Sequence, residues 1–312
     1  MQKNELRVVF MGTPEISATV LKALINDGYN IVGVIAQPDK PVGRKGILEK
    51  VPTKVVAESF NIPVFQPVKI RLDNNFLKEL APDVIVTVAY GQIVSQEVLD
   101  IPKYGCLNLH GSLLPKYRGA SPIQTALINN DKVSGMTLMQ MIYKMDAGKM
   151  YDKEIVEISK EDNSTSLFIK MGEAASKLIL RALPLYIDGE LPGEEQNEEE
   201  ATYCKMIKPE QEKLDFSLKG EEINGYIRAL SDVPGGYVYL NDQKLKIFKA
   251  EYINEEFPGS IGEIVKADKC GLYIKVVDGV LSVLELQKEG KKRMDYRSFI
   301  NGNQNLLHSI VK

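Results

Sequence analysis

The sequence predicts an α/β protein. Its first part is expected to be a Rossmann-like, open and mostly parallel sheet with flanking helices, and its last part a small OB-like β-barrel. Over residues 6–150, apolar runs of strand length alternate with a helical pattern, as in a parallel sheet whose strands are joined by helices. A long helical pattern covers residues 167–185. Five short alternating segments follow between residues 237 and 287, which is typical of a small barrel.

The first part contains the elements of the expected parallel sheet. Residues 16–25 carry apolar side chains at helical spacing, with Thr13 as the expected N-cap and Pro14 in the first turn. Strands are expected where short apolar or alternating runs occur, at 6–11, 29–36, 84–89, 106–110 and 136–143.

The ends of these strands predict where a ligand binds. Open parallel sheets bind ligands outside the carboxyl ends of their strands. Gly12, the Tyr90-Gly91 pair and the segment from Asn108 to His110 all lie at such ends, so we expect them to converge on one crevice. A dinucleotide site is disfavoured, because the turn at Gly12 lacks the other glycines of Gly-x-Gly-x-x-Gly. Gly111-Ser112 lacks the Gly-x-Ser-x-Gly pattern of a serine hydrolase.

The second part changes character beyond residue 162. The long helix is expected to end near Pro184, residues 194–200 form an acidic segment expected to be an exposed loop, and helical spacing returns over 205–230. Asp278-Gly279 is a hairpin signal. We expect two domains, 1–204 and 205–312, and the barrel strands at 237–240, 245–252, 259–265, 272–276 and 280–287.

Composition limits the functional classes. The charge balance of 39 basic and 42 acidic residues gives −3, so contact with a nucleic acid would have to come from local basic patches. The cysteines Cys106, Cys204 and Cys270 are far apart, which disfavours zinc and disulfide frameworks. The sequence shows no signal peptide and no apolar run near the length of a membrane span, so we expect a cytoplasmic protein.

The stretch from Gly105 to Gly119 carries the strongest chemical signal. Cys106 to His110 alternates, which puts Asn108 and His110 on one face of a strand. An amide donor beside an imidazole can polarise a carbonyl and move a proton. Asn-x-His alone is a weak signal, because a histidine beside a glycine is often structural. Asp146 is either a turn carboxylate or the partner that orients His110.

The order and spacing of the motifs resemble the 10-formyltetrahydrofolate-dependent formyltransferases over nearly the whole chain. The central motif is Leu107-Asn108-Leu109-His110-Gly111-Ser112-Leu113-Leu114-Pro115. The Gly43-Arg44 loop resembles that of family members that formylate initiator methionyl-tRNA. The other matching segments are Val9 to Pro14, Gln37 to Arg44, Val88 to Gly91, Arg118 to Gln124 and Asp146 to Gly148.

The resemblance implies a site and its ligands. It implies transfer of a formyl group from 10-formyltetrahydrofolate to the methionine amine of the initiator tRNA, through a tetrahedral intermediate and without a metal. The implied catalytic residues are Asn108, His110 and Asp146. The implied folate-binding residues are Ser112, Leu113, Leu114 and Pro115, with Tyr90 and Gly91 lining the crevice.

Contacts with tRNA are expected from two basic segments. The connection from residue 38 to residue 50 is long for an α/β domain. It is either a solvated surface loop or a functional one, and the tRNA-binding residues that the resemblance implies there are Arg44 and Lys45. Residues 288–297 carry five positive and two negative side chains, 5 − 2 = +3, and are either a solvated loop or a phosphate-facing surface. Lys291, Lys292 and Arg293 are the expected contacts there. We expect the protein to act as a monomer.

Two other functions stay open. The first is the same chemistry on a small amine, such as a nucleotide sugar or glycinamide ribonucleotide. The long Arg44 loop and the C-terminal barrel argue against the shorter nucleotide enzyme of this group. The second is a non-catalytic RNA-binding module, which would not need Asn108, His110 and Asp146 together.

Overall fold

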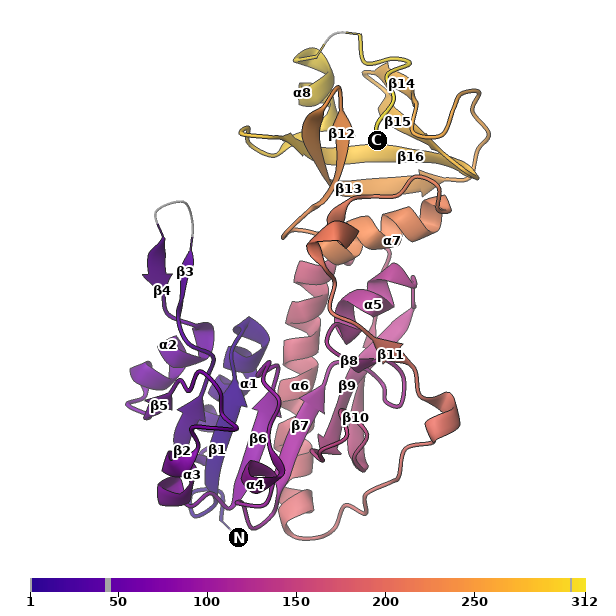
Figure 1. Ribbon diagram of the computed structural model, residues 1–312. Helices are drawn as coiled ribbons and strands as arrows, with labels where there is room; N and C mark the ends of the chain where they lie inside the picture. The colour runs from indigo at the N-terminus through magenta and orange to yellow at the C-terminus, as the bar shows by residue number, and fades with distance from the viewer. Residues whose placement is uncertain (1, 43–45, 304) are drawn as a thin grey trace. The chain divides into compact units, whose positions relative to one another are not determined.

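The computed structural model describes residues 2–42, 46–303 and 305–312. The chain divides into two compact units, each of which is described by itself (Figure 1). Two short segments from the middle of the chain belong to the second unit. The first unit is Met1–Pro122, Val133–Glu157 and Phe168–Cys204, and the second is Ile123–Lys132, Ile158–Leu167 and Lys205–Lys312.

A seven-stranded sheet forms the centre of the first unit, in the order β10-β9-β7-β6-β1-β2-β5 (Figure 1). The strands from β7 to β5 in this order are parallel, and β9 and β10 add an antiparallel edge. This confirms the predicted open, mostly parallel sheet. The bounds are β1 Arg7–Gly12, β2 Asn30–Ile35, β5 Val64–Phe65, β6 Val84–Val88, β7 Cys106–His110, β9 Val133–Gln140 and β10 Met150–Glu157.

Helices cover both faces of this sheet, which explains why its central strands are apolar throughout. On one face, α1 (Glu15–Asn26) and α2 (Pro52–Ser59) contact each other and the strands β1, β2 and β5. Elsewhere Leu77 of α3 (Asn75–Leu80) and Val98 of α4 (Gln96–Leu99) join Val9 and Met11 in a buried cluster. The short helix α5 (Pro122–Ile128) follows β8 (Arg118–Gly119), and α6 spans Ser164–Ile187.

Two minor strand pairs complete the first unit. β8 pairs in parallel with β11 (Tyr203–Cys204), so a segment late in the unit lies beside the chain that follows β7. β3 (Lys40–Val42) and β4 (Ile47–Glu49) pair antiparallel. The long connection predicted as a loop is therefore a hairpin where it is described. Arg44 and Lys45 lie outside the described residues.

A six-stranded antiparallel sheet is the core of the second unit and confirms the predicted fold class of this part. Its order is β12-β13-β16-β15-β14, with β17 paired to β16. Helix α7 (Gly220–Leu230) contacts β12, β13 and β16, and α8 (Tyr296–Asn301) contacts β14 to β17. The bounds are β12 Gly236–Leu240, β13 Gln243–Ile253, β14 Ile264–Asp268, β15 Gly271–Val276, β16 Gly279–Lys288 and β17 Met294–Asp295.

The C-terminal segment joins both edges of this sheet. Tyr239 of β12 and Lys312 exchange two backbone hydrogen bonds of 2.8 and 2.9 Å. At the other edge, the N–H of Ile264 in β14 donates to the Ser309 carbonyl at 2.8 Å. Val311 between these contacts is 4% exposed. The final residues therefore satisfy edge groups that would otherwise be left unpaired, as expected for an OB-like barrel.

Three boundaries differ clearly from the expected ones. The strand expected at 136–143 lies three residues earlier, at Val133–Gln140. Helix α6 does not end near Pro184 but continues to Ile187, because the turn after the proline still closes through Asp188 N to Pro184 O at 3.0 Å. The strand expected at 259–265 begins only at Ile264. Gly262 before it has a φ of +81°, which suits a turn rather than a strand.

Three further expectations are corrected. Thr13 does not cap α1, because its hydroxyl accepts a hydrogen bond from Gln37 N at 3.2 Å. Helical spacing over 205–230 becomes an α-helix only from Gly220. Before it there is a short 3-10 helix at Pro209–Glu212, and Leu214 N bonds to Tyr237 O instead. The acidic segment 194–200 is not wholly exposed, because Gln196 is only 8% exposed.

None of the described helices is long and apolar enough to span a membrane.

Candidate active site

β7 presents two polar side chains, Asn108 and His110, on one face of the sheet of the first unit. The strand runs between β6 and β9, with Asn108 in register with Thr87 and His110 in register with Thr137. Alternate residues of a strand point to the same face. The Asn-x-His spacing therefore puts an amide and an imidazole on a common surface, as the sequence predicts.

His110 is held through both ring nitrogens. Its side chain is only 5% exposed. Nε2 lies 2.8 Å from the Tyr117 carbonyl oxygen, and Nδ1 lies 3.7 Å from the Asp146 carboxylate. An acceptor therefore lies near each ring nitrogen, and the one at Nε2 is at hydrogen-bond distance.

Asp146 lies in the loop between β9 and β10. Its φ is +50°, a left-handed conformation that Asp tolerates better than most residues. The Gly119 N–H donates to the carboxylate Oδ2 at 2.8 Å, the same oxygen that faces His110. A Cβ at Gly148 would lie 2.0 Å from the Gln140 carbonyl oxygen, so the loop closes only because this residue is glycine.

The Asn108 amide is available to a ligand. The side chain is partly exposed and has no hydrogen-bond partner in the part of the chain that the structure describes. The hydroxyl of its neighbour Thr87 is buried and also lacks a described partner. An amide N–H held on a rigid strand is the kind of donor that stabilises an oxyanion.

The loop after His110 is fixed by internal hydrogen bonds. Ser112 is fully buried and its hydroxyl donates to the Lys116 carbonyl at 2.6 Å. Leu114 is 1% exposed, and its N–H donates to Thr137 Oγ1 at 3.1 Å. Leu113 and Pro115 are partly exposed. Of the four predicted folate-binding residues, two therefore shape the loop from within and two lie at its surface.

Tyr90 and Gly91 follow β6, next to β7 in the sheet. Tyr90 is 3% exposed, and its hydroxyl has no hydrogen-bond partner among the described residues. Burial raises the pKa of this hydroxyl. Gly91 has a φ of +81°, and the Gln37 side chain donates to the Tyr90 carbonyl at 3.2 Å. Residues that follow β2 and β6 thus meet at the carboxyl ends of these strands.

The family is decided by sequence comparison. The family model "Formyl transferase" matches residues 6–183, and "Formyl transferase, C-terminal domain" matches residues 206–304. The chain belongs to the formyl transferase family. A methionyl-tRNA formyltransferase from Bacillus cereus (strain G9842) is 44% identical over 302 residues, covering 96% of each chain.

Solved structures of other proteins have a similar fold. The N-formyltransferase from Helicobacter canadensis, in complex with folinic acid and dTDP-3-aminofucose, matches with a TM-score of 0.69 at 22% identity, covering 91% of this chain and 99% of that one. HypX from Aquifex aeolicus in complex with tetrahydrofolic acid matches with a TM-score of 0.66 at 15% identity. That match covers 97% of this chain, which spans only 48% of HypX.

The predicted tRNA-binding residues of this formyl transferase differ in their surroundings. Lys291 and Lys292 are exposed. Arg293 forms ion pairs with Asp232 and with Glu285 and lies 4.5 Å above the Phe248 ring. Its guanidinium is therefore engaged within the second unit, and the two lysines are the freer cations of this stretch.

An aromatic and basic surface on β12 and β13 was not predicted. The rings of Tyr237 and Tyr239 meet edge to face with centroids 5.6 Å apart. Lys244 Nζ lies 3.6 Å from the Tyr237 centroid, and Lys213 Nζ lies 5.9 Å from that of Tyr239. Lysines interleaved with aromatic rings suit nucleic-acid binding. Period-two alternation of Tyr237 and Tyr239 on one strand was the sequence signal that could have revealed it.

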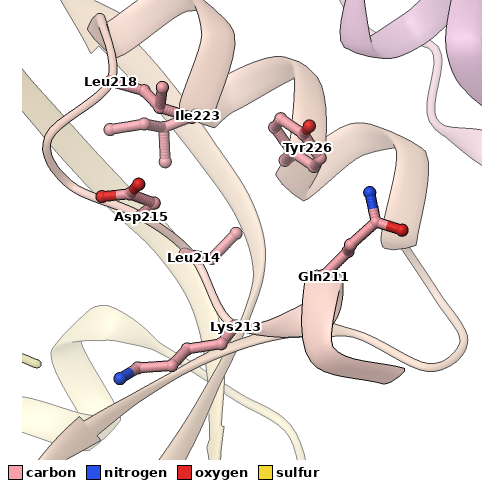
Figure 2. A pocket seen from close by; sticks show the side chains of 7 residues that line it. All are labelled: Gln211, Lys213, Leu214, Asp215, Leu218, Ile223 and Tyr226. Atoms are coloured by element: carbon pink, nitrogen blue, oxygen red, sulfur yellow. The ribbon is translucent and has the colours of Figure 1, made fainter. Parts of the chain in front are cut away.

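A pocket of about 180 Å³ lies in the second unit (Figure 2). Leu214, Ile223 and Tyr226 provide apolar lining, and Lys213 and Asp215 are among its polar lining residues. Small-molecule sites usually occupy about 300–1,000 Å³, so this pocket is small for a cofactor. It contains none of the predicted site residues. Among the described residues, no group of three His, Cys, Asp or Glu side chains could hold a metal ion.

Glu198 is a surface carboxylate of the first unit that forms two ion pairs. Its titration falls in a pH range in which stability can be measured. Arg118 Nη2 lies 2.9 Å and Lys144 Nζ 2.8 Å from its carboxylate. Hydrogen bonds from Arg118 and then from Lys144 lower the pKa of Glu198 from 4.5 to about 2. Because the pKa is lower in the folded chain, the stabilisation is complete above pH 4.5 and is lost as the pH falls towards 2.

We predict that Glu198→Gln lowers the thermal unfolding midpoint, and that its difference from the wild type narrows as the pH falls from 4.5 to 2. Calorimetry over this range measures it. Glu199→Gln is the matched control, because Glu199 is an exposed neighbour in the same segment. A deficit for Glu198→Gln that stays constant with pH would contradict the assignment.

Proposed function

We propose that the protein transfers a formyl group from 10-formyltetrahydrofolate to the α-amino group of methionine on initiator methionyl-tRNA. The observation that carries this proposal is the grouping of Asn108, His110 and Asp146 in a chain with a near full-length methionyl-tRNA formyltransferase relative. The product, N-formylmethionyl-tRNA, would serve translation initiation, which takes place in the cytoplasm.

We propose that the folate binds at the carboxyl ends of β6 and β7. Two buried hydroxyls there, those of Thr87 and Tyr90, have no hydrogen-bond partner among the residues that the structure describes. An unpaired buried polar group typically costs about 1–3 kcal/mol, a cost that polar atoms of a ligand would remove. Gly91, Leu113 and Pro115 would line the crevice, while Ser112 and Leu114 hold the loop in shape. The folate supplies the formyl group.

Asn108 is proposed to stabilise the developing negative charge. Attack of the neutral amine on the formyl carbon turns the carbonyl oxygen into an oxyanion in a tetrahedral intermediate. The Asn108 amide, which has no competing described partner, would donate its N–H to that oxygen. An amide carried on a strand of the central sheet needs little reorganisation to act as such a donor.

His110 and Asp146 are proposed to act together beside Asn108. The imidazolium would add positive charge next to the oxyanion. It would give a proton to N10 of the folate as the C–N10 bond breaks and tetrahydrofolate leaves, and the neutral ring would then take the proton that leaves the amine. Asp146, 3.7 Å from Nδ1, would orient the ring and favour its charged form. The Tyr117 carbonyl at Nε2 fixes the other side of the ring.

The tRNA is proposed to contact both domains. We assign catalysis to residues 1–204 and a tRNA-contacting, OB-like role to residues 205–312. Arg44 and Lys45 would contact the acceptor end, because a guanidinium can grip phosphate or stack on an unpaired base. Lys291 and Lys292 would contact the backbone, and Arg293 would order that loop. The Tyr237–Tyr239 surface with Lys244 is a further candidate contact.

The first prediction concerns the chemistry. Asn108→Ala should lower kcat by about 10²–10³-fold, the usual loss of an oxyanion donor. His110→Ala should lower it by about 10²–10⁴-fold, and Asp146→Asn should also be severely impaired. Initial rates with saturating folate donor and charged initiator tRNA measure these losses.

The other histidine provides the control. His308→Ala should keep the wild-type rate, since His308 is an exposed residue of the second unit paired with Glu263. Circular dichroism should show that the variants stay folded. A fully active His110→Ala protein would remove this residue from the mechanism.

A second prediction tests the tRNA substrate. Arg44→Ala should lower kcat/KM for charged tRNA by about 10²-fold or more, if the guanidinium helps to position the acceptor end, while folate affinity stays unchanged. Arg44→Lys should restore activity only in part, because an ammonium cannot reproduce the planar fork.

Lys50→Ala is the control for this loop, because Lys50 is paired with Glu58 at 2.7 Å. It should change kcat/KM little, as expected for one screened cation. Wild-type kinetics for Arg44→Ala would mean that the loop does not read tRNA and would favour a small amine as the acceptor.

A further inference from the structure

We propose that Gln196 and Arg118 are positioning residues for Asp146. They belong to segments that are far apart in sequence and that meet behind the loop carrying the carboxylate. The inference rests on the proposed function, because it assigns these residues a role through Asp146. It gives the 194–204 segment, defined as the chain from Glu194 to Cys204, a part in the reaction.

Gln196 forms hydrogen bonds to two carbonyl groups of the loop that carries Asp146. Its side-chain amide Nε2 donates to the Asp146 carbonyl oxygen and to the Gly148 carbonyl oxygen, both at 2.8 Å. Gln196 is 8% exposed, so water does not compete for these bonds. One amide thus fixes two carbonyls of a loop in which Asp146 has a φ of +50°.

Arg118 orients this amide. Its Nε donates to Gln196 Oε1 at 2.9 Å. An Asn or Gln side chain could be turned by half a rotation with little change in shape, but here a guanidinium can face only the oxygen. The contact therefore directs the two N–H groups of Gln196 towards the loop. Arg118 is 1% exposed, and its other nitrogens bond to Glu198 and Tyr203.

The same segments hold the carboxylate and the imidazole from the other side. β11 pairs with β8, so that Arg118 N donates to Thr202 O at 2.8 Å. Gly119 N then donates to the Asp146 carboxylate at 2.8 Å. A Cβ at Gly119 would lie 2.1 Å from the Cys204 carbonyl oxygen. The 194–204 segment therefore bonds directly to the backbone of the Asp146 loop and acts on the carboxylate through its pairing with β8, which carries Gly119.

Geometry explains why this matters for rate. Asp146 acts on His110 across 3.7 Å, and a carboxylate displaced further would orient the ring less well. Misplacement of a reacting group by about 1 Å can cost about 10²-fold in rate. Gln196 touches neither the substrate crevice nor the ring, so its loss should affect turnover rather than folate binding.

A double-mutant cycle tests the proposal with the full-length protein. Gln196→Leu should lower kcat by about 10²-fold and leave KM for 10-formyltetrahydrofolate unchanged. The double variant Gln196→Leu/Asp146→Asn should be no slower than Asp146→Asn alone, because groups that act as a unit lose activity only once. Arg118→Lys should fall between wild type and Gln196→Leu.

Two further variants make the outcome decisive. Gln196→Glu keeps the side-chain shape and the Arg118 contact but loses both N–H donors. Its kcat should equal that of Gln196→Leu. If Gln196→Leu does not fold, Gln196→Glu takes its place in the double-mutant cycle. Glu199→Ala, at an exposed position of the same segment, should keep the wild-type kcat.

Each result has one meaning. Losses that multiply in the double variant, or a wild-type kcat for Gln196→Glu, would overturn the positioning role while leaving the proposed function intact. A wild-type kcat for Asp146→Asn would overturn the proposed mechanism and the positioning role together.

Discussion

The placement of one carboxylate, that of Asp146, is the constraint on which the candidate active site depends. The loop that carries it must adopt a left-handed backbone at Asp146 and must close tightly enough that only glycine fits at position 148. In return, a single oxygen accepts the Gly119 N–H and faces His110. The imidazole is then held between that oxygen and the Tyr117 carbonyl. The parallel sheet supplies the rigid strand on which Asn108 and His110 are presented.

Charge is distributed locally rather than over the whole chain. A net charge of −3 gives no general attraction for RNA. The proposed tRNA contacts therefore depend on separate features: the Arg44 loop, the exposed lysines near residue 291, and the lysines packed on Tyr237 and Tyr239. Such dispersed contacts make affinity sensitive to salt, because each phosphate contact releases counterions. Several weak contacts would together determine the position in which the tRNA binds.

The elements that depend on local pattern could be predicted from the sequence. The apolar strands β1, β6 and β7 and the convergence of their carboxyl ends followed from periodicity, and so did the helix α1 and the antiparallel strands after residue 236. The Asn108 and His110 face was predicted for the same reason. The arrangement of Arg118 and Gln196 was not, because their contact joins residues 78 positions apart. No periodic pattern predicts that an arginine such as Arg118 is buried. The acidic composition of residues 194–200 predicts an exposed segment, even though one of its side chains, that of Gln196, is buried.

The central claim is that this crevice formylates the methionine amine of a charged tRNA. In the most direct measurement, the protein is incubated with 10-formyltetrahydrofolate and either charged initiator tRNA or an amino-sugar nucleotide. The amino acid is then released from the tRNA and identified by mass spectrometry. The account predicts N-formylmethionine from the tRNA reaction and no appreciable formylation of the sugar. Unmodified methionine, with formyl transfer to the sugar nucleotide instead, would contradict it.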